Sequence, residues 1–97
     1  MKRLIEQAVH TKRVIQLRYR GSDRIVEPHA YGLDRAGKAL LLCYQEDDTD
    51  QRGAAGGWLR IRLGEVLKAS ETPQNFCAPR SGYIRNDPSF QVIFAQV

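Results

Sequence analysis

A strictly alternating stretch over residues 57–66 limits most strongly how this chain can fold. In a β-strand, successive side chains point to opposite faces of the sheet. The apolar members of the stretch then share one face, and they are Leu59, Ile61 and Leu63. The members on the opposite face are Trp58, Arg60 and Arg62. The stretch therefore predicts a strand with one face in a core and an aromatic ring beside two guanidinium groups on the other.

The rest of the chain has the pattern of one helix followed by short antiparallel strands. Residues 1–13 carry apolar side chains at helical spacing and predict a helix. Alternating or wholly apolar runs separated by turn residues then predict strands over 14–20, 24–32, 39–44, 58–63 and 66–70. Pro28 has no backbone donor, so it predicts an edge or a bend in the second strand. The expected fold is mainly β, a small, strongly bent, five-stranded antiparallel barrel of the SH3 or Sm type behind an N-terminal helix.

Tight turns are expected at Gly21-Ser22-Asp23 and over residues 34–37. Residues 46–56 read as a polar loop, and residues 72–82 as an irregular segment. The tail, residues 87–97, fits two structures. Asp87 before Pro88 suits the start of a helix, whereas the β-branched and aromatic run 91–94 suits a closing strand. The pattern favours a helical turn, and it leaves the strand as the alternative.

The length of 97 residues predicts a single domain, and the charge of the chain favours an anionic partner. The net charge is +4, although residues 46–50 hold four acidic residues and no basic one. Without that segment the chain is strongly basic, and arginine outnumbers lysine. A basic surface favours association with an anionic partner.

Several classes of function are disfavoured by what the sequence lacks. No apolar run reaches the roughly 20 residues of a membrane span, and charge follows Met1 too soon for a signal peptide. A cytoplasmic protein with reduced cysteines and no membrane partner is expected. The soft metal ligands lack the paired spacing of a zinc site, and they are His10, His29, Cys43 and Cys77. No nucleophile elbow or Cys–His motif indicates an enzyme, so no metal, cofactor or catalytic residue is expected.

Five features in sequence order resemble one family. They are Ile5 and Ala8 in the opening helix, Val14-Ile15 leading to Tyr19, Arg24 before Val26-Glu27-Pro28, a Gly37 turn before an apolar strand ending at Tyr44, and Arg60-Ile61-Arg62-Leu63 running into Val66. Their order and spacing over residues 3–71 resemble the WYL domain, a small Sm-like or SH3-like β-barrel of bacterial transcription regulators. Ala39-Leu40-Leu41 stands where that family carries Trp-Tyr-Leu, so the resemblance is to a divergent, stand-alone member.

The resemblance implies a regulatory module that senses a ligand and passes the signal to a DNA-binding regulator. The leading ligands that the resemblance implies are single-stranded nucleic acid and nucleotides. The residues that match the family's positions are Tyr19, Arg24, Tyr44 and Arg62.

The residues themselves indicate the same chemistry. Arginine forks bind phosphate oxygens, and aromatic rings stack on bases. The arginines expected at the site are Arg18, Arg20, Arg24, Arg60 and Arg62, with Trp58, Tyr19, Tyr44 and Tyr31 as aromatic partners. If the first and fourth strands lie close together, four of these arginines share an outer face.

Two other readings stay open. The arginines can form an ordinary solvated face, paired with acids such as Glu27. The protein is then an interaction domain that forms a homodimer or docks on a regulator through its apolar tail and the edge near Pro28. A small-molecule enzyme is the more distant alternative.

Overall fold

The computed structural model describes residues 1–46 and 57–97. One helix, α1 (Lys2–Thr11), opens the chain. The strands and one short 3-10 helix follow it, and they are β1 (Arg13–Tyr19), β2 (Ser22–Asp34), β3 (Ala39–Gln45), β4 (Gly57–Arg62), η1 (Leu63–Glu65), β5 (Val66–Asn75) and β6 (Phe90–Gln96). Part of the loop expected over residues 46–56, from residue 47 onward, lies outside the described residues.

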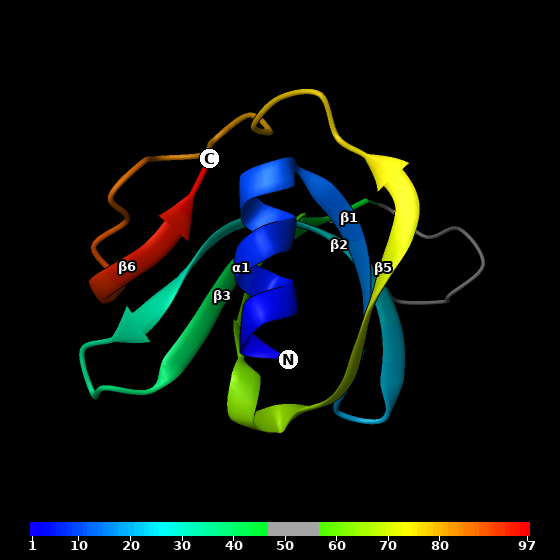
Figure 1. Cartoon of the computed structure of the whole chain (residues 1–97). Helices are drawn as coiled ribbons and strands as arrows, with labels where there is room; N and C mark the ends of the chain where they lie inside the picture. The colour runs from blue at the N-terminus through cyan, green and yellow to red at the C-terminus, as the bar shows by residue number, and fades with distance from the viewer. Residues whose placement is uncertain (47–56) are drawn as a thin grey trace.

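All strand pairs are antiparallel, in the order β4-β3-β2-β1-β5, and β6 pairs with β2. The long strand β2 organises the sheet, because its first half pairs with β1 and its second half lies between β3 and β6 (Figure 1). The register of β2 against β3 shifts between Pro28 and Ala30. The bend expected at Pro28 is therefore confirmed, whereas β2 is not an edge strand. The mainly β, strongly bent barrel-like fold is the predicted one.

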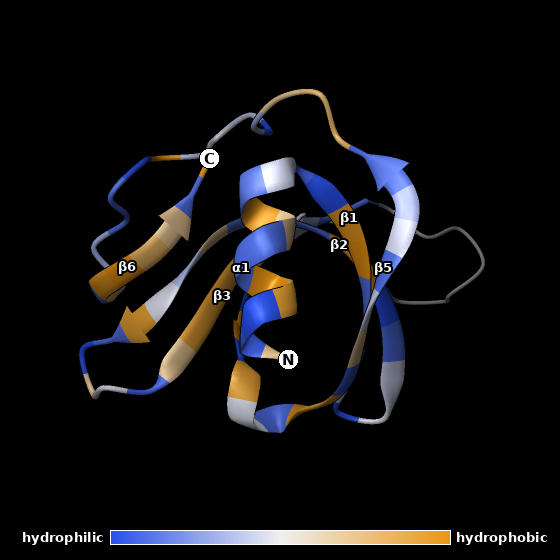
Figure 2. Cartoon of the chain, in the orientation of Figure 1, coloured by the Kyte–Doolittle hydropathy of each residue, from blue (hydrophilic) through white to orange (hydrophobic). Residues whose placement is uncertain are grey.

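The main core lies between α1 and the strands, and a second, smaller cluster lies on the other side of the β2–β3–β4 sheet. Figure 2 shows the apolar stripe of α1, whose buried residues are Ile5, Ala8 and Val9. Strand β3 serves both clusters, because Leu41 is buried in the main core while Leu40 and Leu42 belong to the second. That two-sided burial explains why β3 is apolar at consecutive positions.

The alternation predicted for residues 57–66 is confirmed. Ile61 and Leu63 are buried in the main core, and Leu59 packs against it. Arg60 and Arg62 are exposed on the opposite face. The break expected at Gly64 is the 3-10 turn η1 between β4 and β5.

The tail is a strand, so the helical turn favoured above is wrong. Strand β6 pairs with β2, with Ile93 opposite Gly32. Backbone pairing with a strand distant in sequence satisfies its hydrogen bonds better than one isolated helical turn, which is costly to nucleate.

Two further boundaries differ from expectation. Strand β5 runs to Asn75, into the segment expected to be irregular, because it follows β1 along its whole length. The first hairpin turns at Arg20 and Gly21, both with positive φ, rather than at residues 21–23. A two-residue loop with positive φ at both positions matches the twist of the adjoining strands.

Among the described residues, no helix is both long and apolar enough to cross a membrane.

A thiol reagent such as DTNB is expected to react rapidly with Cys77 and to reach Cys43 only after unfolding. Cys77 is exposed, whereas Cys43 is buried, and this burial raises the pKa of its thiol well above the usual range. The measurement is the number of thiols that react with DTNB per protein, which should be one, rapidly, in buffer and two in denaturant. The variant Cys77→Ser loses the fast equivalent, and a fast reaction of that variant would contradict the placement of Cys43 in the core.

Candidate ligand-binding cleft

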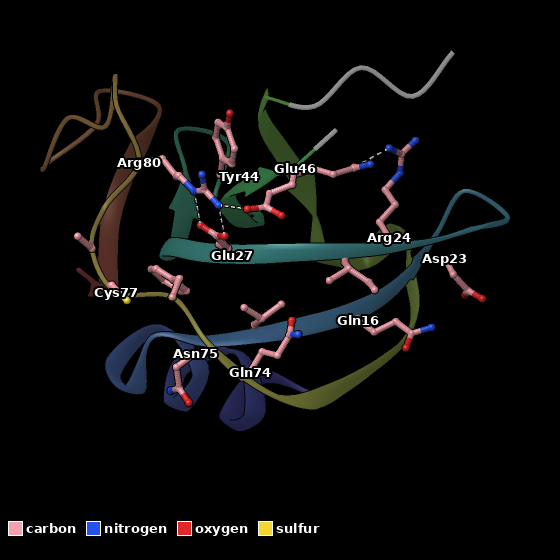
Figure 3. A pocket seen from close by; sticks show the side chains of 15 residues that line it. Gln16, Asp23, Arg24, Glu27, Tyr44, Glu46, Gln74, Asn75, Cys77 and Arg80 are labelled. Carbon is pink, nitrogen blue, oxygen red and sulfur yellow. Dashed lines mark hydrogen bonds and ion pairs between the residues drawn. The ribbon is translucent and has the colours of Figure 1, made fainter. Parts of the chain in front are cut away.

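An open cleft of about 1010 Å³ lies on the described part of the chain. It runs along the outer surface of β1 and β2, between the end of β3 and residues 74–80, which comprise the end of β5 and the segment after it (Figure 3). Its apolar lining comes from Val14, Ile25 and Phe76. Its amides are Gln16, Gln45, Gln74 and Asn75. A mixed apolar and amide lining suits a ligand with a flat face and polar edges.

Arg24 supplies a cation to this cleft that has no carboxylate partner among the described residues. Its Nη1 donates to Oε1 of Gln45 at 2.9 Å. Its Nε is buried and has no hydrogen-bond partner in the described part of the chain. A buried donor without a partner costs free energy, and a ligand acceptor that draws the Arg24 side chain toward the cleft would recover it.

Arg80 forms the other charged centre of the cleft. Its Nε and Nη2 donate to the two carboxylate oxygens of Glu27 at 2.8 and 2.7 Å, and Nη2 also contacts Glu46. The guanidinium lies over the ring of Tyr44, 4.9 Å from its centroid. Figure 3 shows these four side chains converging on one end of the cleft. Because both carboxylates contact it, the pKa of Arg80 is raised further.

His29 fixes the backbone that carries Arg80. The backbone N–H of Arg80 donates to Nε2 of His29 at 3.1 Å, and Nδ1 lies 2.8 Å from the carbonyl oxygen of Glu27. A backbone N–H can only donate, so Nε2 carries the lone pair and Nδ1 carries the proton. Burial lowers the pKa of His29, which keeps the ring neutral.

An aromatic cluster surrounds His29 and closes the back of the site. The ring stacks on Phe76 at 5.0 Å between centroids and meets Trp58 edge-on at 4.7 Å. Tyr83 lies 5.2 Å from the same ring and stacks on Trp58. The segment that follows β5 is thus anchored on β2 and β4 by aromatic packing.

The predicted site residues fall into five places, and only Arg24 and Tyr44 lie in the cleft. Arg18 pairs with Asp23 at the β1–β2 hairpin. Tyr19 and Arg20 both contact Glu65 in η1. Arg60 is paired with Asp87. Three arginines of the expected face, Arg18, Arg20 and Arg60, therefore already have a carboxylate partner.

Trp58 and Arg60 lie beneath the segment 81–89. The indole N–H of Trp58 donates to the carbonyl oxygen of Ser81, and Tyr83 stacks on the ring. Arg60 contacts both Asp87 and Ser89. The indole therefore already has an aromatic partner, and this limits its use as a platform for bases. In the described residues β1 pairs with β2 and β5, and β4 pairs with β3, so the shared outer face expected for Arg18, Arg20, Arg60 and Arg62 is not formed.

Arg62 lies in a second, smaller hollow of about 500 Å³ beside the start of α1. Lys2 and Lys38 also line this hollow. The carboxylate of Asp34 accepts hydrogen bonds from the backbone N–H groups of Lys38 and Ala36, and these bonds together with the charges of Arg62 and Lys38 lower its pKa. The hollow is therefore basic, and the carboxylates of Asp34 and Glu65 neutralise part of its charge.

Sequence reasoning missed Arg80 and the role of His29. Arg80 falls in a segment with no periodic pattern, so no local signal places it near Glu27 or Tyr44. The one available signal was Glu27 itself, an acid between Val26 and Pro28 in a predicted strand, which needs a cation when it is buried. In the described residues no cluster of His, Cys, Asp and Glu has the arrangement of a metal site.

Searches against protein-family models, curated proteins and solved structures returned no significant match to this chain.

Proposed function

We propose that this protein is a non-enzymatic ligand-binding module that recognises a nucleotide, free or within single-stranded nucleic acid, in the cleft around Arg24 and Tyr44. The observation that carries the proposal is the Arg24 guanidinium, which lines the cleft with a buried Nε that lacks a partner among the described residues. Phosphate oxygens, like carboxylate oxygens, are among the acceptors that a guanidinium binds most strongly.

The remaining lining suits the rest of a nucleotide. Tyr44 with Arg80 stacked over it presents a flat polar surface, and bases stack on both aromatic rings and guanidinium planes. The amides of Gln16 and Gln74 can exchange hydrogen bonds with a base edge. Cys77 lines the cleft, but no histidine or lysine lies among the described lining residues to act as its general base, which favours binding over catalysis.

The resemblance to the WYL family supports the same proposal. Of the four residues that match its positions, Arg24 and Tyr44 line the cleft. Under this proposal the protein acts in the cytoplasm and reports ligand occupancy to a DNA-binding regulator.

The variant Arg24→Gln is expected to weaken binding of a short fluorescein-labelled single-stranded DNA by about tenfold, the effect of one charge-assisted hydrogen bond. Fluorescence anisotropy at two salt concentrations measures it, and binding by the wild type should weaken as salt rises. An unlabelled mononucleotide as competitor distinguishes free nucleotide from a nucleic-acid chain.

The matched control is Arg18→Gln, which removes the same charge from the same hairpin but from a side chain paired with Asp23 and half exposed. We expect a change of less than about twofold for it. Equal losses in the two variants, or no binding by the wild type at low salt, would refute the cleft as the nucleotide site.

Protein–protein interaction is the second candidate, and two side chains of β6 favour it. Val92 and Phe94 are 42% and 44% exposed. If they mediate self-association, the double variant Val92→Ser with Phe94→Ser should remain folded by circular dichroism and become monomeric in analytical ultracentrifugation.

A further inference from the structure

The two carboxylates on Arg80 differ sharply in their surroundings. The side chain of Glu27 is 8% exposed and makes two parallel hydrogen bonds with the guanidinium. The side chain of Glu46 is 69% exposed and contacts only Nη2, which already donates to Glu27. Glu27 is therefore the buried, bidentate partner of Arg80, and Glu46 is a second, exposed partner.

Charge balance does not require Glu46. The charge of Arg80 is neutralised by Glu27 alone, and burial of Glu27 is what makes an arginine necessary at this position. Glu46 adds a second negative charge to a cation that is already paired. An ion pair of this exposure contributes little to stability, so the contact is easily exchanged for another anion.

The position of Glu46 coincides with the cleft proposed for the ligand. Glu46 and Arg80 both line it, and Gln45, the neighbour of Glu46, is the residue that holds Arg24. An anion that reaches Arg24 along this wall meets Arg80 with Glu46 already on it (Figure 3). Besides its hydrogen bond to Glu27, Nη2 of Arg80 is thus in contact with a second carboxylate of the protein's own.

We propose that Glu46 is an internal competitor that occupies the place of a ligand phosphate on Arg80, and that Arg80 is a second ligand-binding residue. This inference rests on the proposed function of the cleft. A bound phosphate displaces Glu46 from Nη2 while Glu27 keeps its two hydrogen bonds. Because the competent form is only a fraction of the population, the apparent affinity of the wild type is reduced by that fraction.

Replacing Glu46 with glutamine should therefore tighten binding of the labelled single-stranded DNA by about three- to fivefold, the upper part of the range set by an exposed ion pair. The matched control is Asp23→Asn. It removes the same charge from the same cleft, but from a carboxylate that pairs with Arg18 rather than Arg80. A general relief of repulsion predicts equal gains in the two variants, whereas competition at Arg80 predicts a larger gain for Glu46→Gln.

A double-mutant comparison identifies Arg80 as the residue involved. In an Arg80→Gln background, Glu46→Gln should no longer tighten binding, and the single variant Arg80→Gln should bind more weakly than the wild type. Circular dichroism checks that Arg80→Gln remains folded, because Glu27 loses its partner in it. If it unfolds, the comparison is repeated with Arg80→Lys, which keeps a cation beside Glu27 but loses the forked guanidinium, and the gain from Glu46→Gln should then be smaller than in the wild type.

The outcomes separate this inference from the proposed function. Binding that depends on Arg24 but is unchanged by Glu46→Gln, or improved equally by Asp23→Asn, overturns the internal competitor and leaves the cleft as the nucleotide site. Failure of both the wild type and Glu46→Gln to bind the DNA or a mononucleotide at low salt overturns both proposals.

Discussion

The variant Gly32→Ala is expected to lower the free energy of unfolding by about 3 kcal/mol, the upper end of the cost of overpacking a core. A Cβ at position 32 would overlap the carbonyl oxygen of Val92 and lie 2.9 Å from Cα of Ile93. Both are backbone atoms of β6, so no side-chain rotation relieves the clash. The strand must move away from β2, which breaks its pairing.

Thermal unfolding measures the effect, and a loss of this size lowers the Tm of a domain of about this length by roughly 15 °C. Gly64→Ala is the matched control. A Cβ at Gly64 meets nothing within 4 Å, and we expect its stability to stay within about 0.5 kcal/mol of the wild type. A Gly32→Ala variant as stable as Gly64→Ala would show that β6 does not pass Gly32 this closely.

The second large effect is a loss of stability in acid that depends on His29. Burial is the main reason that the pKa of His29 is lowered, and the charge of Arg80 lowers it further. The hydrogen bond to the backbone of Glu27 and the charge of Glu27 oppose the shift. The other groups against the ring are uncharged at neutral pH, and they are Trp58, Phe76 and Tyr83.

The lowered pKa fixes the direction of the effect. The unfolded chain binds a proton at His29 near its ordinary pKa of about 6.5, whereas the folded protein binds it only at lower pH. Stability from His29 is therefore complete above about pH 6.5 and is lost as the pH falls toward the folded pKa. The slope reaches at most about 1.4 kcal/mol per pH unit for one proton. Protonation of Nε2 also breaks its bond with the N–H of Arg80.

Urea unfolding between pH 7.5 and 5 measures this slope. The variant His29→Gln is expected to be less stable at neutral pH and to lose most of the slope. His10→Gln is the control, because His10 is exposed on α1 and we expect the slope to remain. A slope that persists in His29→Gln would assign the acid sensitivity to carboxylates instead, such as Asp87, whose pKa is lowered by hydrogen bonds from Ser89 and by Arg60.

Periodicity predicted the elements whose burial repeats along the chain. The alternation of Leu59, Ile61 and Leu63 placed β4 with the correct face inward, and the bend at Pro28 followed from its missing donor. These inferences succeeded because a strand with one buried face records that face in every second residue.

The tail is a segment whose local pattern does not decide its secondary structure. Its sequence fits a helical turn and a strand alike, and the choice depended on Gly32, which allows β2 and β6 to approach closely. No local property of residues 90–96 contains that information, because the deciding contact lies on a strand far away in the sequence.

The sequence by itself determined the antiparallel barrel-like fold, the inward face of its strands and the excess of arginine. Tertiary structure alone decided which arginines keep their charge available. Asp23, Glu65 and Asp87 neutralise Arg18, Arg20 and Arg60, while Arg24 lies in the cleft beside an amide. Ion pairs form between side chains that folding brings together, and they leave no periodic pattern in the sequence. A guanidinium can therefore be counted from sequence, but its partner comes only with the fold.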